Sequence, residues 1–230
     1  MKGLFPVFHY LPALCGIYAG QVLAIQPDVH LSLSVVKVIA STPAGKNHMG
    51  SGVIIAPNKI ATNCHVTRDA SRISVTKSGE SYKVIKQAAL PEYDVCILES
   101  TALPLPNASL ADKDSLTIGS EIYLYGFPYA LGMRSMPGSV VALHRHGKDP
   151  VIEIDAGFMQ GASGGGIFNG KGELVGLTTF MGRDGKQFHF YAIPAEWLAK
   201  ALHEPFMPVH AFQQLSFWEN GAFVRNQRSD

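Results

Sequence analysis

A histidine, an aspartate and a serine lie in three short motifs that together could perform nucleophilic catalysis. His65 lies in ATNCHV at positions 61–66, Asp94 in YDVCIL at positions 93–98, and Ser163 in QGASGGG at positions 160–166. A serine hydroxyl is a poor nucleophile at neutral pH unless an imidazole takes its proton and a carboxylate orients that imidazole. The three residues therefore predict a catalytic triad, with Ser163 as nucleophile, His65 as base and Asp94 as orienting acid.

The residues around Ser163 are small, which suits a second requirement of this chemistry. Glycines at positions 161, 164 and 165 allow the backbone to approach a substrate closely. Backbone N–H groups in such a loop can point at the oxyanion that develops when a carbonyl is attacked. We expect the amides of Gly161 and Ser163 to form this oxyanion hole.

Short apolar runs, separated by Gly, Pro, Asn and Asp, indicate the elements that position these residues. Short strands at intervals of about ten residues are typical of a barrel or sandwich. A hairpin is expected at Asn169-Gly170, and a helix over residues 194–203, which Pro194 begins. The expected strands are Leu33–Ala40, Val53–Ala56, Ile73–Lys77, Lys83–Lys86, Val95–Leu98, Ile122–Tyr125, Val140–Leu143, Val151–Ile154 and Leu174–Phe180.

Residues 101–114, which include Pro104 and Pro106, have the composition of a connection between two blocks of strands. We therefore expect an N-terminal barrel over about residues 30–104 and a C-terminal barrel over about residues 115–193, in a domain that covers residues 25–204. The histidine and the aspartate come before this connection and the serine after it. A site shared by the two halves would lie where binding clefts commonly form.

The composition is that of an ordinary globular protein. Hydrophobic residues make up 47% of the 230 residues and charged residues 16%, so the chain can bury a substantial core. The formal net charge of +1 gives no electrostatic reason to expect nucleic acid or an acidic membrane surface as a partner.

Several spaced motifs resemble those of the HtrA/Deg serine proteases. GSGVII at 50–55, followed by TNCHV at 62–66, is similar to the first barrel of that family. LTIGSE at 116–121, YGFP at 125–128, GSVVAL at 138–143, GELVGL at 172–177 and YAIP at 191–194 are similar to its second barrel. The resemblance, in collinear order over residues 35–200, implies an all-β fold of two six-stranded antiparallel β-barrels with a C-terminal helix. It also implies a serine endopeptidase that needs no cofactor, acts on proteins or peptides through an acyl-enzyme, and could form a homo-oligomer.

The loop around the serine departs from the family pattern at two positions. The family has Asn before the serine and Pro after the glycine pair, whereas this chain has Ala162 and Gly166. Alanine cannot pair with a newly cut N-terminus, so we expect no trypsin-like zymogen activation. The extra glycine predicts a looser loop and leaves open whether the oxyanion hole assembles only when a substrate or partner binds.

The resemblance also implies a primary substrate pocket. Gly157 takes the position at its base, Thr178, Thr179 and Phe180 line one wall, and Gln160 belongs to the loop beside it. None of these residues is acidic, so none could pair with a Lys or Arg side chain of a substrate. We expect cleavage after small or medium apolar residues.

Both ends of the sequence suggest processing or packing. Residues 1–24 are interpreted as a signal peptide that ends at the small-residue pattern VLA, which predicts export to the periplasm or secretion. A retained anchor is disfavoured because Pro6 and Pro12 shorten the apolar run, so no stable membrane insertion is expected after removal of the leader. Residues 205–230 are too few for a PDZ domain, and their aromatic content predicts packing on the domain or contact with another subunit.

Cysteines and histidines leave two smaller questions. Cys64 and Cys96 could form a disulfide in an oxidising compartment, or could pack as buried thiols, and their spacing does not decide. His144 and His146 alternate on an expected strand, but no third ligand is evident, so no metal site is predicted.

Two other functions compete with the protease. GASGG at 161–165 also fits the nucleophile elbow of α/β-hydrolases, with Asp184 and His203 as formal partners. That motif requires a helix directly after the serine, and a run of glycines is a poor helix former. The other alternative is a non-catalytic binding module on a protease scaffold, because a fold does not guarantee an activity.

Overall fold

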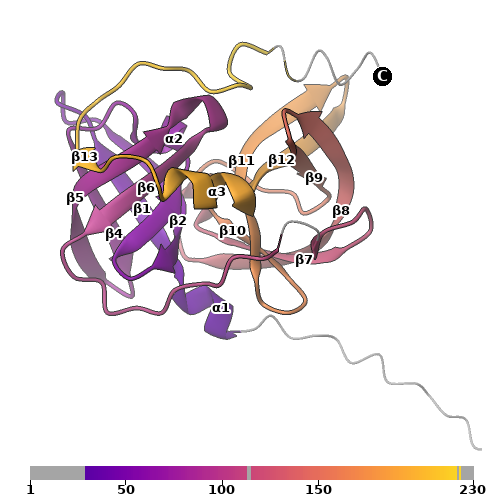
Figure 1. Ribbon diagram of the computed structural model, residues 1–230, viewed down its shortest axis with the longest axis horizontal. Helices are drawn as coiled ribbons and strands as arrows, with labels where there is room; N and C mark the ends of the chain where they lie inside the picture. The colour runs from indigo at the N-terminus through magenta and orange to yellow at the C-terminus, as the bar shows by residue number, and fades with distance from the viewer. Residues whose placement is uncertain (1–28, 113–114, 222, 224–230) are drawn as a thin grey trace, which may run out of the picture.

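Two β-barrels lie side by side in the computed structural model, which describes residues 29–112, 115–221 and 223 (Figure 1). A short helix, α3 (Ala195–Ala201), lies between the barrels in this view, and the chain that follows α3 passes over them. Within the described residues, no helix is long and apolar enough to cross a membrane.

The first barrel is built from β1 to β6 and is antiparallel throughout. The sheet order is β5-β4-β1-β2-β3-β6, and β5 also pairs with β6, which closes the barrel. The strands are β1 (Val35–Ser41), β2 (Asn47–Ala56), β3 (Lys59–Thr62), β4 (Arg72–Lys77), β5 (Glu80–Leu90) and β6 (Val95–Ser100). Short helices flank them: α1 (Val29–Leu33), α2 (Cys64–Thr67) and the 3₁₀ turn η1 (Pro91–Tyr93).

The second barrel closes in the order β10-β11-β12-β9-β8-β7. Its strands are β7 (Glu121–Gly126), β8 (Arg134–His146), β9 (Asp149–Ile154), β10 (Gly166–Asn169), β11 (Leu174–Asp184) and β12 (Gln187–Pro194), and η3 (Pro128–Ala130) follows β7. The two-residue β13 (Met207–Pro208) adds to β5 of the first barrel. The predicted fold of two six-stranded antiparallel barrels with a C-terminal helix is confirmed.

Three apolar clusters explain why these strands close as they do. Alternate side chains of the first barrel, such as Val38, Ile54 and Leu98, fill its interior. Ile122 and Ile154 belong to the equivalent cluster of the second barrel. The third cluster joins residues of both barrels with α3, whose Trp197 is fully buried. Because this cluster is continuous, the two barrels share one interface core and hold a fixed relation to each other.

The predicted elements differ from the observed ones mainly at their ends. The strand expected from Leu33 begins at Val35, because the Ser34 hydroxyl donates to the Leu31 carbonyl at 2.9 Å and completes the last turn of α1. Helix α3 is shorter than the predicted 194–203, since Pro194 has extended dihedral angles. Strand β12 was predicted only as a motif at 191–194, although Phe188 and Phe190 alternate with polar residues in the half that starts at Gln187.

The connection between the barrels is attached to both of them. Its Leu103 and Ala108 are buried, and the Ala108 amide donates to the Ile54 carbonyl at 2.8 Å in the first barrel. On the other side, the Leu174 amide of β11 donates to the Ser109 carbonyl at 2.8 Å. The segment therefore bridges the two barrels rather than looping freely between them.

A disulfide fastens α2 to β6. Cys64 and Cys96 are bonded, with their Cα atoms 4.9 Å apart and a separation of 32 positions in sequence. Cys64 immediately precedes His65, and Cys96 is two residues after Asp94. The bond thus decides between the two alternatives left open by the spacing, and it joins the segments that carry the two residues.

We predict that replacing both cysteines destabilises the fold. A cross-link over a loop of this length is worth about 4 kcal/mol through the entropy of the unfolded chain. Cys64→Ala/Cys96→Ala should therefore unfold at a lower urea concentration than the oxidised protein. Wild type with the disulfide reduced is the control, and its urea midpoint should lie close to that of the variant. Equal midpoints for the oxidised protein and the double variant would contradict this.

Candidate active site

His65 and Asp94 form a doubly hydrogen-bonded pair. His65 Nδ1 lies 2.8 Å from Asp94 Oδ2, and the backbone N–H of His65 donates to Asp94 Oδ1 at 2.9 Å. Both carboxylate oxygens are thus engaged by one residue, which fixes the imidazole ring and assigns Nδ1 to the acid. The other ring nitrogen, Nε2, is left for chemistry, and His65 lines a cleft.

The backbone around Asp94 explains why the pair forms. Asp94 ends the turn η1 with φ of 59°, a left-handed conformation that aspartate tolerates better than most residues. Its backbone carbonyl accepts hydrogen bonds from the Cys64 amide and from the Asn63 side chain, each at 3.2 Å. The main chain and the side chain of Asp94 therefore both bind the start of α2, where His65 lies.

The Asp94 carboxylate is fully buried and accepts three further hydrogen bonds. Thr179 Oγ1 of β11 donates to Oδ2 at 2.6 Å, Trp218 Nε1 donates to Oδ2 at 3.1 Å, and Ser216 Oγ donates to Oδ1 at 3.1 Å. Burial alone would raise the pKa of Asp94, but the charge of His65 and the hydrogen bonds from His65 and Thr179 outweigh it. The pKa of Asp94 is lowered from its ordinary value, and the acid stays ionised at neutral pH.

Ser163 lies on the second-barrel side of the same cleft as His65. The cleft has a volume of about 520 Å³, and Gln160 and Gly161 also line it. Ser163 Oγ donates to the Thr179 carbonyl at 3.2 Å, and no hydrogen bond joins it to His65 in this structure. The three residues predicted from the sequence are thus brought together from both barrels, with the serine hydroxyl turned to a neighbouring carbonyl.

The serine loop is folded tightly against the first barrel. Ser51 of β2 donates from its amide to the Ser163 carbonyl and from its hydroxyl to the Gly161 carbonyl, both at 2.8 Å. Gly164 has φ of +82°, and a Cβ there would lie 2.1 Å from the Ser51 carbonyl oxygen. Only glycine therefore fits at this position, because φ is positive and the Ser51 carbonyl oxygen occupies the place of a Cβ.

Two backbone N–H groups in this loop have no acceptor among the residues that the structure describes. The Gln160 carbonyl accepts a hydrogen bond from the Tyr129 amide at 2.6 Å, and the peptide that follows is trans, so the Gly161 N–H points the opposite way. Neither this N–H nor that of Ser163 donates to any residue that the structure describes. Two unpaired donors beside a serine hydroxyl suit a developing oxyanion.

The residues predicted for the substrate pocket lie close together but differ in exposure. Gln160 lines the cleft, whereas Thr178 is buried and donates from its hydroxyl to the Ala162 carbonyl at 2.6 Å. A Cβ on Gly157 would lie 3.3 Å from the ring of Phe190.

The two other pocket residues face the acid and the C-terminal segment. Thr179 is buried and directs its hydroxyl at Asp94. The ring of Phe180 is stacked between those of Tyr191 and Trp218, with centroid distances of 4.6 and 4.9 Å. Sequence analysis did not identify Ser216 or Trp218 as part of the site. The only available signal was the aromatic content of the segment, which specifies no partner.

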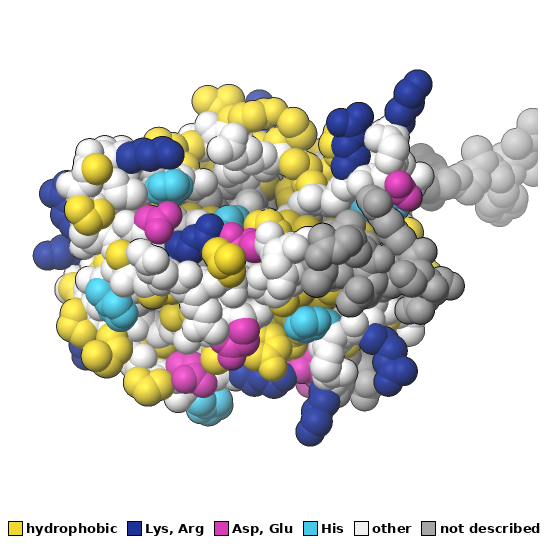
Figure 2. Space-filling model, turned by 90° about the horizontal axis from the view of Figure 1, so that it is seen from above, with side chains coloured by type: hydrophobic (Ala, Val, Ile, Leu, Met, Phe, Trp, Pro, Cys, Tyr) yellow, Lys and Arg dark blue, Asp and Glu magenta, His cyan; other side chains and the backbone are white. Residues whose placement is uncertain are grey.

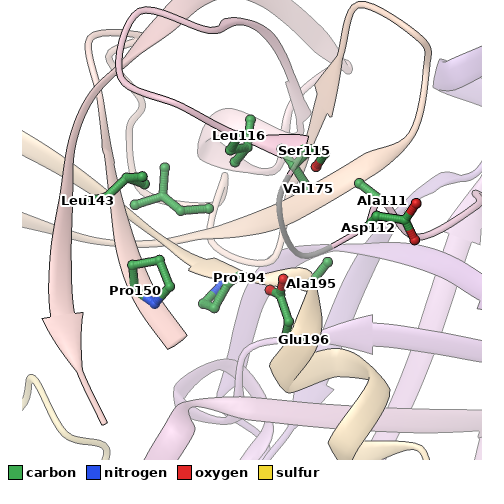
Figure 3. Close-up of a pocket in the computed structure, with 11 residues that line it drawn as sticks. Ala111, Asp112, Ser115, Leu116, Leu143, Pro150, Val175, Pro194, Ala195 and Glu196 are labelled. Carbon is green, nitrogen blue, oxygen red and sulfur yellow. The ribbon is translucent and has the colours of Figure 1, made fainter. Parts of the chain in front are cut away.

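Two alternatives to this site are not supported by the geometry. Ser163 is followed by strand β10 and not by a helix, so the nucleophile elbow of α/β-hydrolases is absent here. A second hollow, where the barrel connection meets β8, β9 and α3, has a volume of only about 30 Å³ (Figure 3). That volume is close to the share of one water molecule in the liquid, so it is too small for a substrate.

The charged side chains on the face in Figure 2 are mixed in sign. Lys and Arg are separated by Asp, Glu and uncharged side chains over the coloured part of that face. This arrangement forms no continuous basic surface there, in keeping with the net charge of +1.

Comparisons with known proteins concern the family and the fold. The sequence model of the family described as trypsin-like peptidase domain matches residues 50–177, more than half of the chain. The probable periplasmic serine endoprotease DegP-like of Buchnera aphidicola subsp. Schizaphis graminum is 33% identical over 193 residues, which cover 79% of this chain and 40% of that protein. The chain spans between 32% and 40% of the lengths of the first curated relatives that it matches.

Solved structures show the same fold. The serine endoprotease from Yersinia pestis is 28% identical with a TM-score of 0.67, over 77% of this chain and 65% of that chain. The Rv3671c protease from M. tuberculosis in its active form has a TM-score of 0.72 at 23% identity, over 93% of this chain and 97% of that chain. At 23% identity, the similarity to the Rv3671c protease concerns the fold alone.

We predict that the stability contributed by Asp94 is lost in acid. Because its pKa is lowered on folding, the unfolded chain binds the proton more readily. The contribution is therefore fully present above the ordinary carboxyl pKa of 3.8 and disappears as the pH falls through the lower folded value. The difference in unfolding free energy between wild type and Asp94→Asn should shrink between pH 6 and pH 3, as measured by urea denaturation. A difference that does not change with pH would contradict this assignment.

Proposed function

The chain belongs to the trypsin-like peptidase family, and from this premise we propose that it is a serine endopeptidase. One observation carries the proposal: His65 is oriented by a buried, ionised Asp94 and lines the same cleft as Ser163. This chain matches only part of the length of the relatives that bear protease names. The activity is therefore proposed from the site and not transferred from them.

The proposed reaction proceeds through an acyl-enzyme. The Ser163 hydroxyl first turns from the Thr179 carbonyl toward His65, a rotation about one side-chain bond. His65 takes the proton as Ser163 Oγ attacks the peptide carbonyl, and then returns it to the leaving amine. A water molecule, activated by the same imidazole, hydrolyses the acyl-enzyme. Asp94 remains ionised and stabilises the imidazolium that forms.

The unpaired N–H groups of Gly161 and Ser163 would stabilise the oxyanion in each tetrahedral intermediate. The orientation of the Gly161 N–H depends on the Gln160 carbonyl of the same peptide, which accepts a hydrogen bond from the Tyr129 amide at 2.6 Å. Removing one such donor from a serine protease costs about 10²–10³ in rate. This orientation of the Gly161 N–H supports the proposal that the two amides form the oxyanion hole.

The proposed preference is for apolar residues before the scissile bond, and the cleft lining argues against Lys or Arg there. None of the residues that line it is Asp or Glu, so a Lys or Arg side chain would find no counter-charge. Gly157, Thr178 and Phe180 are proposed to shape the pocket, together with Gln160 and Thr179. The proposed substrates are proteins or peptides, and no cofactor takes part in the reaction.

We also propose that the protein works outside the cytoplasm. The DegP-like relatives are named as periplasmic proteins, and the disulfide between Cys64 and Cys96 suits an oxidising compartment. The predicted signal peptide, residues 1–24, lies outside the described residues.

A non-catalytic binding module is the second candidate, and the orientation of the Ser163 hydroxyl favours it. A serine that donates to a carbonyl instead of to the imidazole is not poised for attack. In that case the cleft would bind peptides without cleaving them. Reactivity of the hydroxyl separates the two functions.

We predict that a fluorophosphonate probe labels wild type at Ser163. An activated hydroxyl attacks this reagent, whereas an ordinary serine does not. Mass spectrometry should locate the label on Ser163, and Ser163→Ala should remain unlabelled. His65→Ala keeps the serine but removes the base, so its labelling should be slower by at least about 10³-fold. Absence of labelling in wild type, together with peptides left uncut, would favour the binding module.

We predict that cleavage of a peptide library occurs after residues such as Ala, Val and Leu. The sequences on both sides of each cut are read by mass spectrometry, with Ser163→Ala as the control for contaminating proteases. Preferential cleavage after Arg, Lys or Glu would show that the proposed pocket is wrong and that a charged group outside it selects the substrate.

A further inference from the structure

The chain that follows α3 supplies two of the five hydrogen bonds accepted by the Asp94 carboxylate. Ser216 Oγ donates to Oδ1 and Trp218 Nε1 donates to Oδ2, both at 3.1 Å, and the Asp94 side chain has no exposed surface. An ionised carboxylate without water is stable only when its oxygens are hydrogen-bonded. These two residues therefore contribute to the environment that keeps the acid charged.

Several contacts fix this segment on the first barrel. β13 pairs with β5, and the Phe217 amide donates to the Glu92 carbonyl at 3.1 Å, two residues from Asp94. Arg68, which caps α2, donates to both carboxylate oxygens of Glu219 at 2.6 Å. The segment is thus anchored to η1, which ends at Asp94, and to α2, which contains His65.

The Trp218 ring also restricts His65. Its plane is perpendicular to the imidazole, with ring centroids 5.4 Å apart, and parallel to the ring of Phe180 within 9°. One side chain therefore donates to the acid and packs against the base. The stacking on Phe180 of β11 holds the indole in place, so its N–H stays directed at Asp94.

We propose that Ser216 and Trp218 are positioning residues of the active site, a proposal that rests on the proposed serine-peptidase function. They act through Asp94: each adds a donor to one carboxylate oxygen, beside those of His65 and Thr179, which further restricts the carboxylate and keeps water from it. Without them, water would reach the carboxylate and compete with the imidazole for it. The acid would then orient His65 for a smaller fraction of the time, and proton transfer from Ser163 would slow.

Phe217 lies between the two positioning residues and provides a matched control. Its ring packs among Trp197, Phe180 and Phe223, with no hydrogen bond to Asp94. Phe217→Leu removes packing from the same segment and retains both hydrogen bonds to the acid. Ser216→Ala/Trp218→Phe removes both hydrogen bonds and retains an aromatic ring against Phe180.

The test compares these variants in two measurements on the intact chain. The first is the rate of fluorophosphonate labelling at Ser163. The second is the proton NMR signal of His65 Nδ1–H, which the short contact with Asp94 shifts downfield and protects from exchange.

In Ser216→Ala/Trp218→Phe we expect labelling to slow by about 10- to 100-fold, the effect of losing hydrogen bonds to a charged group. We expect the downfield signal to move and to exchange faster with water. Phe217→Leu should lower the melting temperature but keep both the rate and the signal.

The proposal is overturned if the folded double variant retains the wild-type rate and signal, or if Phe217→Leu changes both equally. If the double variant does not fold, the single variant Ser216→Ala, which removes only one hydroxyl, takes its place in the test. An unchanged labelling rate and an unchanged NMR signal in Ser216→Ala would overturn the proposal. If wild type is not labelled at all, the peptidase function fails, and the NMR signal alone decides the positioning role. A signal that shifts in the double variant and not in Phe217→Leu supports it, and an unchanged signal overturns it.

Discussion

The buried carboxylate of Asp94 is the group on which the rest of the site depends. A charge removed from water costs several kcal/mol unless donors replace the solvent, and here five hydrogen bonds replace it. Two come from His65 in the first barrel, one from Thr179 in the second, and two from the segment after α3. No single element of the fold could satisfy this acid, so its ionisation depends on all three parts packing together.

The same requirement explains the interface between the barrels. The third apolar cluster holds β11 against β6 and α3, which brings the Thr179 hydroxyl within 2.6 Å of an acid carried by the other barrel. The serine loop is held in a similar way, because Ser51 of β2 binds two of its carbonyls. Polar contacts that cross the interface therefore set the geometry of the cleft, and apolar contacts supply most of the adhesion.

Local patterns predicted much of the architecture and the residues that meet in the cleft. Strands such as Val95–Leu98 and Val151–Ile154 are apolar runs between turn residues, and this signal is carried by the sequence itself. The hydrogen bonds of Ser216 and Trp218 could not be predicted, because they join residues more than 120 positions apart. The role of Gly166 also required coordinates: a Cβ there would lie 2.6 Å from the Phe168 ring, so a larger residue has no room in this packing.

The position of Ser216 and Trp218 after both barrels in the sequence has a consequence for biosynthesis. A ribosome releases the strands of both barrels before it releases these residues, so a nascent chain could close its barrels around an acid that still lacks two donors. The triad would then be completed only after the last part of the chain had emerged and docked, and a chain shortened before Ser216 would keep both barrels but leave the acid with three of its five donors.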